Sequence, residues 1–508
     1  MTELPHGWVE AQLEHLCEIL DFKRIPVNSK ERQRRIEGKS PQELYPYYGA
    51  TGQVDVIDGY LFEGEHVLIG EDGAPFLDPL KPKAYMVDGK FWVNNHAHIL
   101  CSLGNNRFLC HYLNYIRYED HVTGTTRLKL TKSALVVIPV LVPPLSEQRR
   151  IVEKIEARFD AIDKGVESLK TARTALGLYR QSLLKSAFEG RLTADWRARN
   201  ADKLEAPETL LARIQAERET RYKAALDDWQ EALAAWRAGG EKGRKPAKLA
   251  RPSSAIIAVQ AVRKISVPKA WAVEALGNLP TDNLIGLVRS SQQQSFDDGG
   301  SRYVKMDRID MNGGVDTATM VRIQCSDDET QRFSLQPGDL LFNTRNSLEL
   351  VGKTGIVKRT VDDATVYNNN LMRIRLTDRT VPEYVCYWMI SPAFRKVVEP
   401  IKRATTSVAA VYAKDLWPLP VPICSPAEQA EIVRLLDARL AAADTLEGEI
   451  DAALTRASAL RQSILKKAFS GQLVPQDPGD EPAAALLARI RAERAKAPKT
   501  AWKRKAPA

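Results

Sequence analysis

The sequence predicts an α+β protein in which two globular domains are separated by two long antiparallel helices that form a coiled coil. Three observations predict this class: a tandem repeat with a long helical pattern in each copy, a strand-rich variable block before each pattern, and a length of 508 residues. A chain of this length exceeds the size at which one core keeps growing, so at least two globular units are expected. Apolar residues make up 44% and charged residues 27%, which excludes a wholly disordered chain.

The repeat is a segment of 46 residues that occurs twice without a gap. Residues 147–192 match residues 428–473 at about 19 positions, with a constant spacing of 281. Constant spacing is expected of a long helix, because one inserted residue would rotate every later side chain off its face. A Pro-x-x-Trp segment opens each half, at Trp8 and Trp271, and a Leu-Leu-Ala-Arg-Ile segment follows each helical pattern. The chain is therefore expected to be a pseudo-two-fold tandem repeat.

The first long helix is expected from Ser146 to Phe188. Ser146 follows two prolines and is a natural N-cap, and Gly190 is expected to end the helix. Apolar side chains recur every three or four residues between these ends, which is the pattern of a coiled-coil seam. The copy from Glu428 to Phe469 has the same seam, so the two helices are expected to pack against each other. Burial of the seams on separate bundles is the alternative.

The block before each helix is interpreted as a compact α+β domain. Strand-like runs at residues 54–57, 66–69 and 339–342 are interrupted by Gly- and Asn-rich turns, and residues 383–390 have a helical pattern. The two blocks differ in sequence although the frame around them is repeated, which indicates that each recognises something different. The predicted division is a first variable domain (1–144), a central helical region (145–238), a linker rich in Gly, Pro and basic residues (239–262), a second variable domain (263–424) and a C-terminal helical region with a basic tail (425–508).

Composition narrows the class of protein further. No apolar run approaches the roughly 18 residues of a membrane helix, and no leader-like segment is recognisable, so a cytoplasmic protein without a membrane partner is expected. The six cysteines form no Cys-x-x-Cys pair and are interpreted as small buried thiols. Lys and Arg (73) exceed Asp and Glu (64), and this net charge of +9 is compatible with nucleic-acid binding without proving it.

No catalytic, metal or cofactor motif is recognisable, so the chain is not expected to be an enzyme. Residues 351–354 (Val-Gly-Lys-Thr) resemble the end of a phosphate-binding loop, but the glycine that this motif needs five residues before Gly352 is Ser347. His96 and His98 could face one side of a strand and hold a metal, but no further ligand is recognisable nearby. A methyltransferase or nuclease with an unrecognised site, and a coiled-coil scaffold without a DNA role, are the alternatives.

Several polar segments have the side chains that typically contact DNA. Arginine pairs with guanine edges and asparagine with adenine edges, while a basic stretch between Lys23 and Lys39 could follow the phosphate backbone. For any single segment a solvated polar loop is the alternative, and only their number favours DNA. The predicted DNA-contacting residues are Tyr47, Tyr48, Thr51, His96, His98, Thr125, Thr126 and Arg127 in the first block, and Asn343, Arg345, Asn346, Lys353, Asn368, Asn369, Thr405, Thr406 and Ser407 in the second.

Together these features resemble the specificity (S) subunit of type I restriction–modification systems, over essentially the whole chain. Residues 423–424 (Ile-Cys) depart from the usual double proline before the second helix, which affects only local loop geometry. The resemblance rests on the two Trp segments, the segments before the long helices (142–148 and 421–429), the helix ends (181–188 and 462–469) and three motifs of the variable blocks (47–49, 95–98 and 336–342).

The resemblance implies a noncatalytic DNA-specificity subunit of a multisubunit methyltransferase and endonuclease. The two variable domains would be target-recognition domain 1 (1–144) and target-recognition domain 2 (263–424). Each would read one half of a bipartite DNA site, and the helical pair would set the spacer between the halves. The implied partners are double-stranded DNA, two adenine-N6 methyltransferase (M) subunits docked on the helices, and the restriction (R) motor-nuclease subunits. S-adenosylmethionine, ATP and Mg²⁺ are expected on those partners, with no cofactor in this chain.

Overall fold

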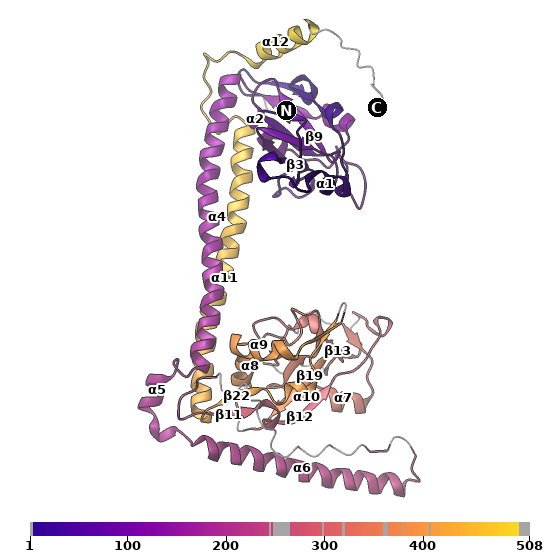
Figure 1. The fold of residues 1–508 in the computed structure, drawn as a ribbon, viewed down its shortest axis with the longest axis vertical. Coiled ribbons are helices and arrows are strands. Elements are labelled where there is room, and N and C mark those ends of the chain that lie inside the picture. The colour runs from indigo at the N-terminus through magenta and orange to yellow at the C-terminus, as the bar shows by residue number, and fades with distance from the viewer. Residues whose placement is uncertain are drawn as a thin grey trace. The chain divides into compact units, whose positions relative to one another are not determined.

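The chain folds into two compact units, each of which contains a globular domain and part of both long helices (Figure 1). Unit 1 comprises Met1–Ala172 and Gly448–Ala508, and unit 2 comprises Arg173–Glu447. No helix in the described part of the chain is long and apolar enough to cross a membrane. The computed structural model describes residues 4–242, 245–246, 265–296, 299–316, 321–358, 364–378, 380–405 and 408–496.

The domain of unit 1 contains two four-stranded sheets, with the strand orders β2-β9-β6-β7 and β4-β3-β8-β5. Neighbouring strands are antiparallel except β3 and β8, which are parallel. Helix α2 packs on the first sheet, and β1 pairs with β10 where the chain enters and leaves the domain. The elements are β1 (Val9–Gln12), β2 (Cys17–Ile19), α1 (Ser29–Ile36), β3 (Tyr45–Gly49), β4 (Gly52–Ile57), β5 (Phe62–Glu63), β6 (His66–Gly70), β7 (Ala84–Val87), β8 (Lys90–Val93), β9 (Ala97–Ser102), α2 (Asn106–Tyr115), α3 (Lys132–Val136) and β10 (Pro139–Val142).

The domain of unit 2 has a four-stranded sheet of order β12-β19-β15-β17 and two three-stranded sheets, β14-β13-β18 and β16-β21-β20. Strands β13 and β18 are parallel, and β11 pairs with β22 at the base of the domain. The elements are β11 (Ala272–Ala275), β12 (Pro280–Ile285), β13 (Ser301–Val304), β14 (Arg322–Ile323), α7 (Asp327–Phe333), β15 (Leu340–Asn343), β16 (Arg345–Asn346), β17 (Thr354–Ile356), β18 (Thr365–Tyr367), β19 (Leu371–Leu376), α8 (Pro382–Ile390), α9 (Pro392–Val398), β20 (Arg403–Ala404), β21 (Ala409–Ala410), α10 (Ala413–Leu416) and β22 (Pro420–Ile423).

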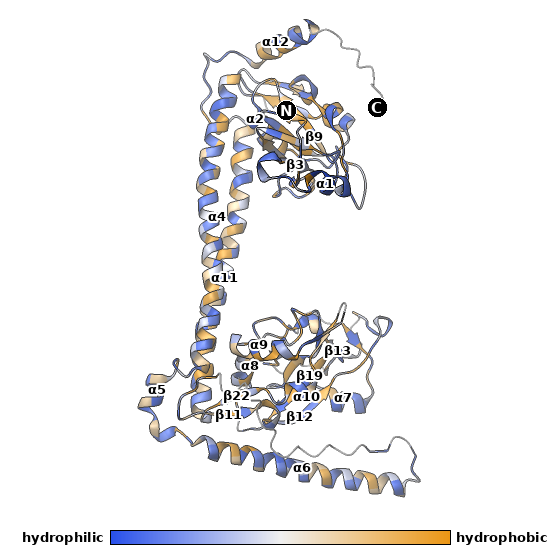
Figure 2. Ribbon diagram, in the orientation of Figure 1, coloured by the Kyte–Doolittle hydropathy of each residue, from blue (hydrophilic) through white to orange (hydrophobic). Residues whose placement is uncertain are grey.

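The two domains share one strand connectivity although their sequences differ. In both four-stranded sheets that support a helix, the first strand in chain order pairs with the fourth, the fourth with the second, and the second with the third. The parallel pair β3 and β8 corresponds to β13 and β18. Apolar residues are concentrated in these sheets (Figure 2), because both sheet faces and the helix on them must exclude water.

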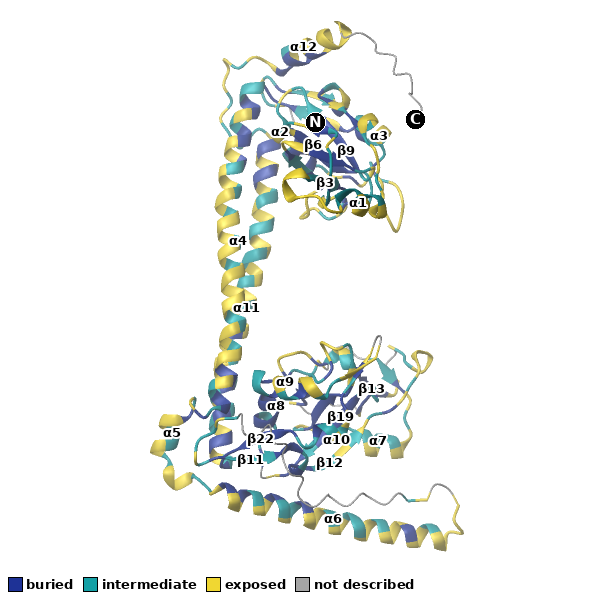
Figure 3. Ribbon diagram, viewed as in Figure 1, coloured by how far each residue is buried: buried dark blue, intermediate teal, exposed yellow. Residues whose placement is uncertain are grey.

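Five helices form the repeated frame. In unit 1, Ile151 near the start of α4 lies in the same core as Leu465 near the end of α11, and in unit 2, Leu183 near the end of α4 lies with Ile432 near the start of α11. The helices are therefore antiparallel in each unit, as predicted, and their ends are the most deeply buried parts (Figure 3). The helices are α4 (Leu145–Phe188), α5 (Ala194–Arg199), α6 (Pro207–Ala238), α11 (Pro426–Phe469) and α12 (Ala483–Lys496).

The predicted ends of the long helices need small corrections. Helix α4 begins at Leu145, so Ser146 lies inside the first turn and is not the N-cap; its hydroxyl donates to Asp480 at 2.5 Å. Helix α11 begins at Pro426, two residues earlier than expected, because proline is well tolerated in a first helical turn. Gly190 confirms the predicted stop, with a φ of 70° that favours glycine.

Each domain is attached to its helices by a repeated contact between the Trp segment and the first residue of the repeat. The indole N–H of Trp8 donates to Glu147 at 3.0 Å, and that of Trp271 donates to Glu428 at 2.9 Å. All four residues are at most 5% exposed. This pair of contacts explains why both tryptophans and both glutamates recur in the sequence, and it joins each domain to the start of a long helix.

Candidate nucleic-acid interface

Polar loops gather at the end of strand β6 in the first domain. The backbone N–H of Glu71 donates to the carbonyl of His96 at 2.7 Å, and the carbonyl of Glu71 accepts from the N–H of Leu130 at 2.7 Å. These two bonds bring together residues 71–72, 94–98 and 123–130, which we call the first-domain loop cluster. The cluster contains five of the eight residues predicted to contact DNA in this domain.

The second domain repeats these backbone bonds with different residues. The N–H of Thr344 donates to the carbonyl of Asn370 at 2.8 Å, and the carbonyl of Thr344 accepts from the N–H of Val411 at 2.9 Å. Thr344 follows the end of β15, as Glu71 follows the end of β6. A second group of loops therefore occupies the equivalent position in this domain. We call it the second-domain loop cluster, and it consists of residues 343–346, 368–370 and the described part of 404–411.

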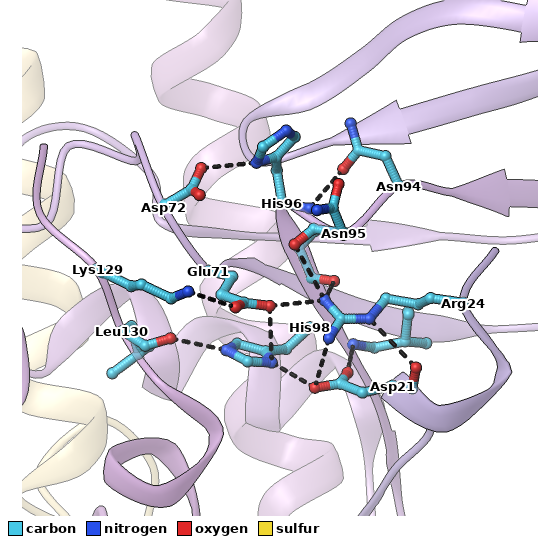
Figure 4. A network of polar contacts seen from close by, with 12 residues as sticks. Asp21, Arg24, Glu71, Asp72, Asn94, Asn95, His96, His98, Lys129 and Leu130 are labelled. Carbon is cyan, nitrogen blue, oxygen red and sulfur yellow. Dashed lines mark hydrogen bonds and ion pairs between the residues drawn. The ribbon is translucent and has the colours of Figure 1, made fainter. Parts of the chain in front are cut away.

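Charged side chains hold the first-domain loop cluster together (Figure 4). At its surface, one carboxylate oxygen of Asp72 accepts from His96 at 2.9 Å and from Arg127 at 2.6 Å. Beneath it, Glu71 pairs with Arg24 at 2.8 Å and with Lys129 at 3.2 Å.

His98 is the buried centre of this cluster and is 1% exposed. Its two ring nitrogens lie 2.5 Å from a carboxylate oxygen of Asp21 and 2.8 Å from the carbonyl of Leu130. Both ring nitrogens of His98 thus face oxygen atoms, so the imidazole links Asp21 to the strand-end loop that carries Leu130. Burial acts to raise the pKa of Asp21, but hydrogen bonding and charge from His98 outweigh it and hold that pKa below its ordinary value. The pKa of Glu71 is also lowered: burial opposes the shift, and Arg24 with His98 overcomes it.

Neutral amides and hydroxyls hold the second-domain loop cluster together. The buried amide of Asn343 donates to the carbonyls of Arg345 and Asn370, each at 3.2 Å, and its oxygen accepts from Asn346 at 3.0 Å. The hydroxyl of Thr344 also donates to the carbonyl of Asn370 at 3.0 Å. The same turn is thus fixed here by neutral hydrogen bonds, which leave the guanidinium of Arg345 exposed.

The predicted contact residues divide into exposed and internal groups. Thr51, at the tip of the β3–β4 hairpin, belongs to the exposed group. Thr406 and Ser407 lie outside the described residues. The exposed group is Thr51, Thr125, Thr126, Arg127, Arg345 and Thr405. The half-buried residues are His96, Asn346 and Asn369 at the clusters and Tyr48 in the sheet. The buried residues are Tyr47, His98, Asn343 and Asn368.

Several of the internal residues have structural partners. The Tyr47 hydroxyl donates to the carbonyl of Val27 at 3.1 Å. The Lys353 ammonium donates to the carbonyls of Met306 and Ile309 at 3.0 and 2.6 Å, and burial lowers its pKa. These side chains support the loops from inside.

The basic stretch between Lys23 and Lys39 is also divided. Arg24, Arg32 and Arg35 are partly buried and pair with Glu71, Asp55 and Asp58 respectively. Lys23, Lys30, Arg34 and Lys39 are exposed.

Sequence reasoning missed Glu71, Asp72 and Thr344, the residues that organise the two clusters. They lie directly after buried strands, Glu71 and Asp72 in the segment Gly-Glu-Asp-Gly and Thr344 in the segment Asn-Thr-Arg-Asn. Polar residues at the end of a buried strand could have identified them from sequence. Among the described residues, no group of three or more His, Cys, Asp or Glu side chains is placed to hold a metal ion.

Comparison with known proteins finds a family model that matches part of the chain and relatives that are similar over most of it. A family model described as the type I restriction modification DNA specificity domain matches residues 5–170. The chain is 27% identical over 403 residues to the EcoKI specificity subunit of Escherichia coli K12, covering 76% of this chain and 72% of that protein. It is 26% identical over 532 residues to the EcoBI specificity subunit of Escherichia coli, covering 97% and 94%.

A solved structure shares the fold over almost the full length. It comes from work on complex assembly and conformational transition of the type I R-M system, and it has a TM-score of 0.56 at 16% identity, covering 93% of this chain and all of that chain. The class is thus a tandem repeat that carries two sheet domains of equal connectivity on shared helices. Within that class, residues 5–170 match the model of the type I restriction modification DNA specificity domain, and most of the chain is similar to specificity subunits of type I restriction enzymes.

Proposed function

We propose that this chain is the noncatalytic DNA-recognition subunit of a type I restriction–modification complex, and that each loop cluster reads one half of a bipartite site. The equivalence of the two clusters carries this proposal. Loops held by the same backbone hydrogen bonds carry charged side chains in the first domain and amide side chains in the second. A common scaffold with different side chains is what two readers of different half-sites require.

The exposed residues supply the chemistry for reading base edges. In the first domain the exposed residues are Thr125, Thr126 and Arg127, and in the second Arg345 is exposed and Asn369 is half-buried. Guanidinium groups match guanine, amides match adenine, and hydroxyls serve either base. The half-buried Asp72 and the buried Asn343 then orient these groups rather than contact DNA. Thr51, Thr405, Thr406 and Ser407 would complete the two contact surfaces.

The helical regions at 145–238 and 425–508 would set the spacer between the half-sites read by the domains at 1–144 and 263–424. DNA presents the same groove face only once per turn of roughly 10 base pairs, so two readers on one rigid support select a defined spacing. Salt bridges between the helices support this rigidity within unit 2, where Arg180 of α4 pairs with Asp444 and Glu447 of α11, each at 2.6 Å.

Two M subunits would dock on the helices, one for each repeat. Tyr179 of α4 and Leu460 of α11 occupy equivalent positions, 281 residues apart, and are 44% and 51% exposed. These two side chains therefore give each repeat an exposed apolar residue at the same place, as one docking surface for each repeat requires. The M and R subunits would supply the sites for S-adenosylmethionine, ATP and Mg²⁺, and the complex would act in the cytoplasm.

Mapping methylated adenines in cells that produce this chain with its M subunit tests the proposal. The expected result is one split motif, and exchange of residues 1–144 for the equivalent block of another family member should change one half only. A continuous motif, or a change in both halves, would overturn the assignment of one reader to each domain.

The purified chain offers a second test, directed at the enzyme and scaffold alternatives. With DNA and labelled S-adenosylmethionine but no M subunit, it should transfer no methyl groups. The complex with the M subunit should bind DNA with an affinity that falls steeply as salt increases, because phosphate contacts release counterions. Methyl transfer by the chain alone, or salt-insensitive binding, would contradict the proposal.

A further inference from the structure

An arginine at the end of a repeated sequence segment fastens helix α12 to the first domain. Arg494 is the last residue of the segment 486–494, which follows the second long helix. Its guanidinium donates to the carbonyls of Glu14 and Cys17 at 2.5 and 2.9 Å. The two carbonyls belong to the sixth and ninth residues after Trp8.

The equivalent arginine makes the same contact in unit 2. Arg218 of α6 donates to the carbonyls of Gly277 and Pro280 at 3.2 and 3.1 Å. These are again the sixth and ninth residues after the tryptophan, here Trp271. Arg218 is only 5% exposed, whereas Arg494 reaches its two carbonyls from the surface. A planar guanidinium can span two carbonyls at once, and a lysine ammonium cannot reproduce that fork.

In the first domain the contacted backbone leads directly to the loop cluster. Cys17 begins strand β2, and β2 pairs with β9. The chain then continues to Asp21, whose carboxylate binds both His98 and the backbone N–H of Ile99. Strand β9 starts immediately after His96, so one pair of strands connects the Arg494 contact to the turn of the first-domain loop cluster.

In the second domain the connection is equally short. Pro280 begins strand β12, which pairs with β19. Just beyond β12, the carbonyl of Leu287 accepts from the N–H of Asn369 at 3.0 Å, within the turn of the second-domain loop cluster. The Arg218 contact and this turn therefore lie at opposite ends of one strand.

We propose that Arg494 and Arg218 are positioning residues for DNA reading, each of which aligns one loop cluster with the helices and so controls how accurately one half-site is read. The inference rests on the proposed function. Neither arginine belongs to a loop cluster or is proposed to touch DNA; each acts through the first strand of its domain's helix-bearing sheet.

Lysine variants test this in the full S–M complex. The controls are Arg489→Lys on α12 and Arg213→Lys on α6, which stand at equivalent repeat positions and pair with Glu481 and Glu205, each two residues before the start of its helix. Assembled complexes would be isolated by size exclusion and given the mapped DNA site, or sites with one base changed in the first or the second half. The readout is the ratio of methylation rates on cognate and altered sites, because this ratio does not depend on how much of the protein is folded.

Arg218→Lys should lower discrimination in the second half about ten-fold and leave the first half unchanged, as loss of charged hydrogen bonds would. Arg494→Lys should lower it in the first half only, and by less, because Arg494 is more exposed. Equal losses in both halves, unchanged ratios, or equal effects of the control variants would overturn the inference. Failure of the wild-type complex to methylate a split motif would instead overturn the proposed function.

Discussion

The two loop clusters have the same backbone hydrogen bonds, but charged side chains hold the first together and neutral side chains hold the second. In the first, the carboxylates of Asp21 and Asp72 bind the imidazole of His98 and the guanidinium of Arg127, and in the second the amide of Asn343 makes the corresponding hydrogen bonds. Backbone bonds between strands hold the turn in both cases, so the side chains are free to differ. The difference indicates how a fold can change what it recognises without changing its core.

At the junctions between domains and helices, the side chains that meet are the same and the groups around them differ. Trp8–Glu147 and Trp271–Glu428 are nearly identical contacts, but only Glu428 has partners on both oxygens, from Thr193 at 2.8 Å and Arg197 at 2.9 Å besides the indole. Glu147 has one carboxylate oxygen without a hydrogen-bond partner among the residues that the structure describes. Both junctions therefore have the same tryptophan and glutamate, but the hydrogen bonds and charges around the glutamate differ between them.

The largest expected effect comes from breaking the charged core of the first-domain loop cluster. His98→Ala removes the imidazole that binds both the buried Asp21 carboxylate and the carbonyl of Leu130, while Arg24 still lies 3.3 Å from Asp21, and should destabilise the first domain by about 3–5 kcal/mol. The matched change Asn343→Ala removes only neutral hydrogen bonds and should cost about 1–3 kcal/mol. Hydrogen exchange of β9 and β19 amides in the full chain measures the two local stabilities separately. Equal losses would show that charge contributes nothing special to the first cluster.

A smaller difference is expected at the junctions. Glu428→Gln removes the charge that pairs with Arg197 and should destabilise unit 2 by about 2 kcal/mol. Burial raises the pKa of Glu147, so the neutral amide of Glu147→Gln should change unit 1 by less than about 0.5 kcal/mol. Calorimetry of both variants provides the comparison. A larger loss for Glu147→Gln would contradict the account of these junctions.

The smallest effect is a difference in acid sensitivity. Since the pKa values of Asp21 and Glu71 are lowered in the folded state, their stabilisation is complete above the ordinary carboxyl pKa values of about 4 and is lost as pH falls through the lowered ones. The first-domain loop cluster should open before the second on acidification. Hydrogen exchange between pH 5 and pH 3, corrected for intrinsic rates, tests this. Simultaneous opening, or no shift in Asp21→Asn, would refute the prediction.

The candidate site could be predicted from sequence only in part. Arg127, Arg345 and Thr405 were found because their side chains suit DNA, and the structure exposes them. Glu71 and Thr344 were missed because the partners that make them important, His96 and Asn370, lie about 25 residues away along the chain. Strand pairing creates that proximity, and strand pairing is decided by burial across the whole sheet.

The sequence by itself determined the two repeated long helices, because a helix is a local structure and its period appears as the spacing of apolar residues along the chain. Residues 147–192 and 428–473 could be recognised as long paired helices before any coordinates were known. Only the tertiary structure decided that two dissimilar blocks share one connectivity and that their loop clusters are equivalent. The reason is physical: sheet topology depends on contacts between distant segments, and many sequences bury the same strands equally well.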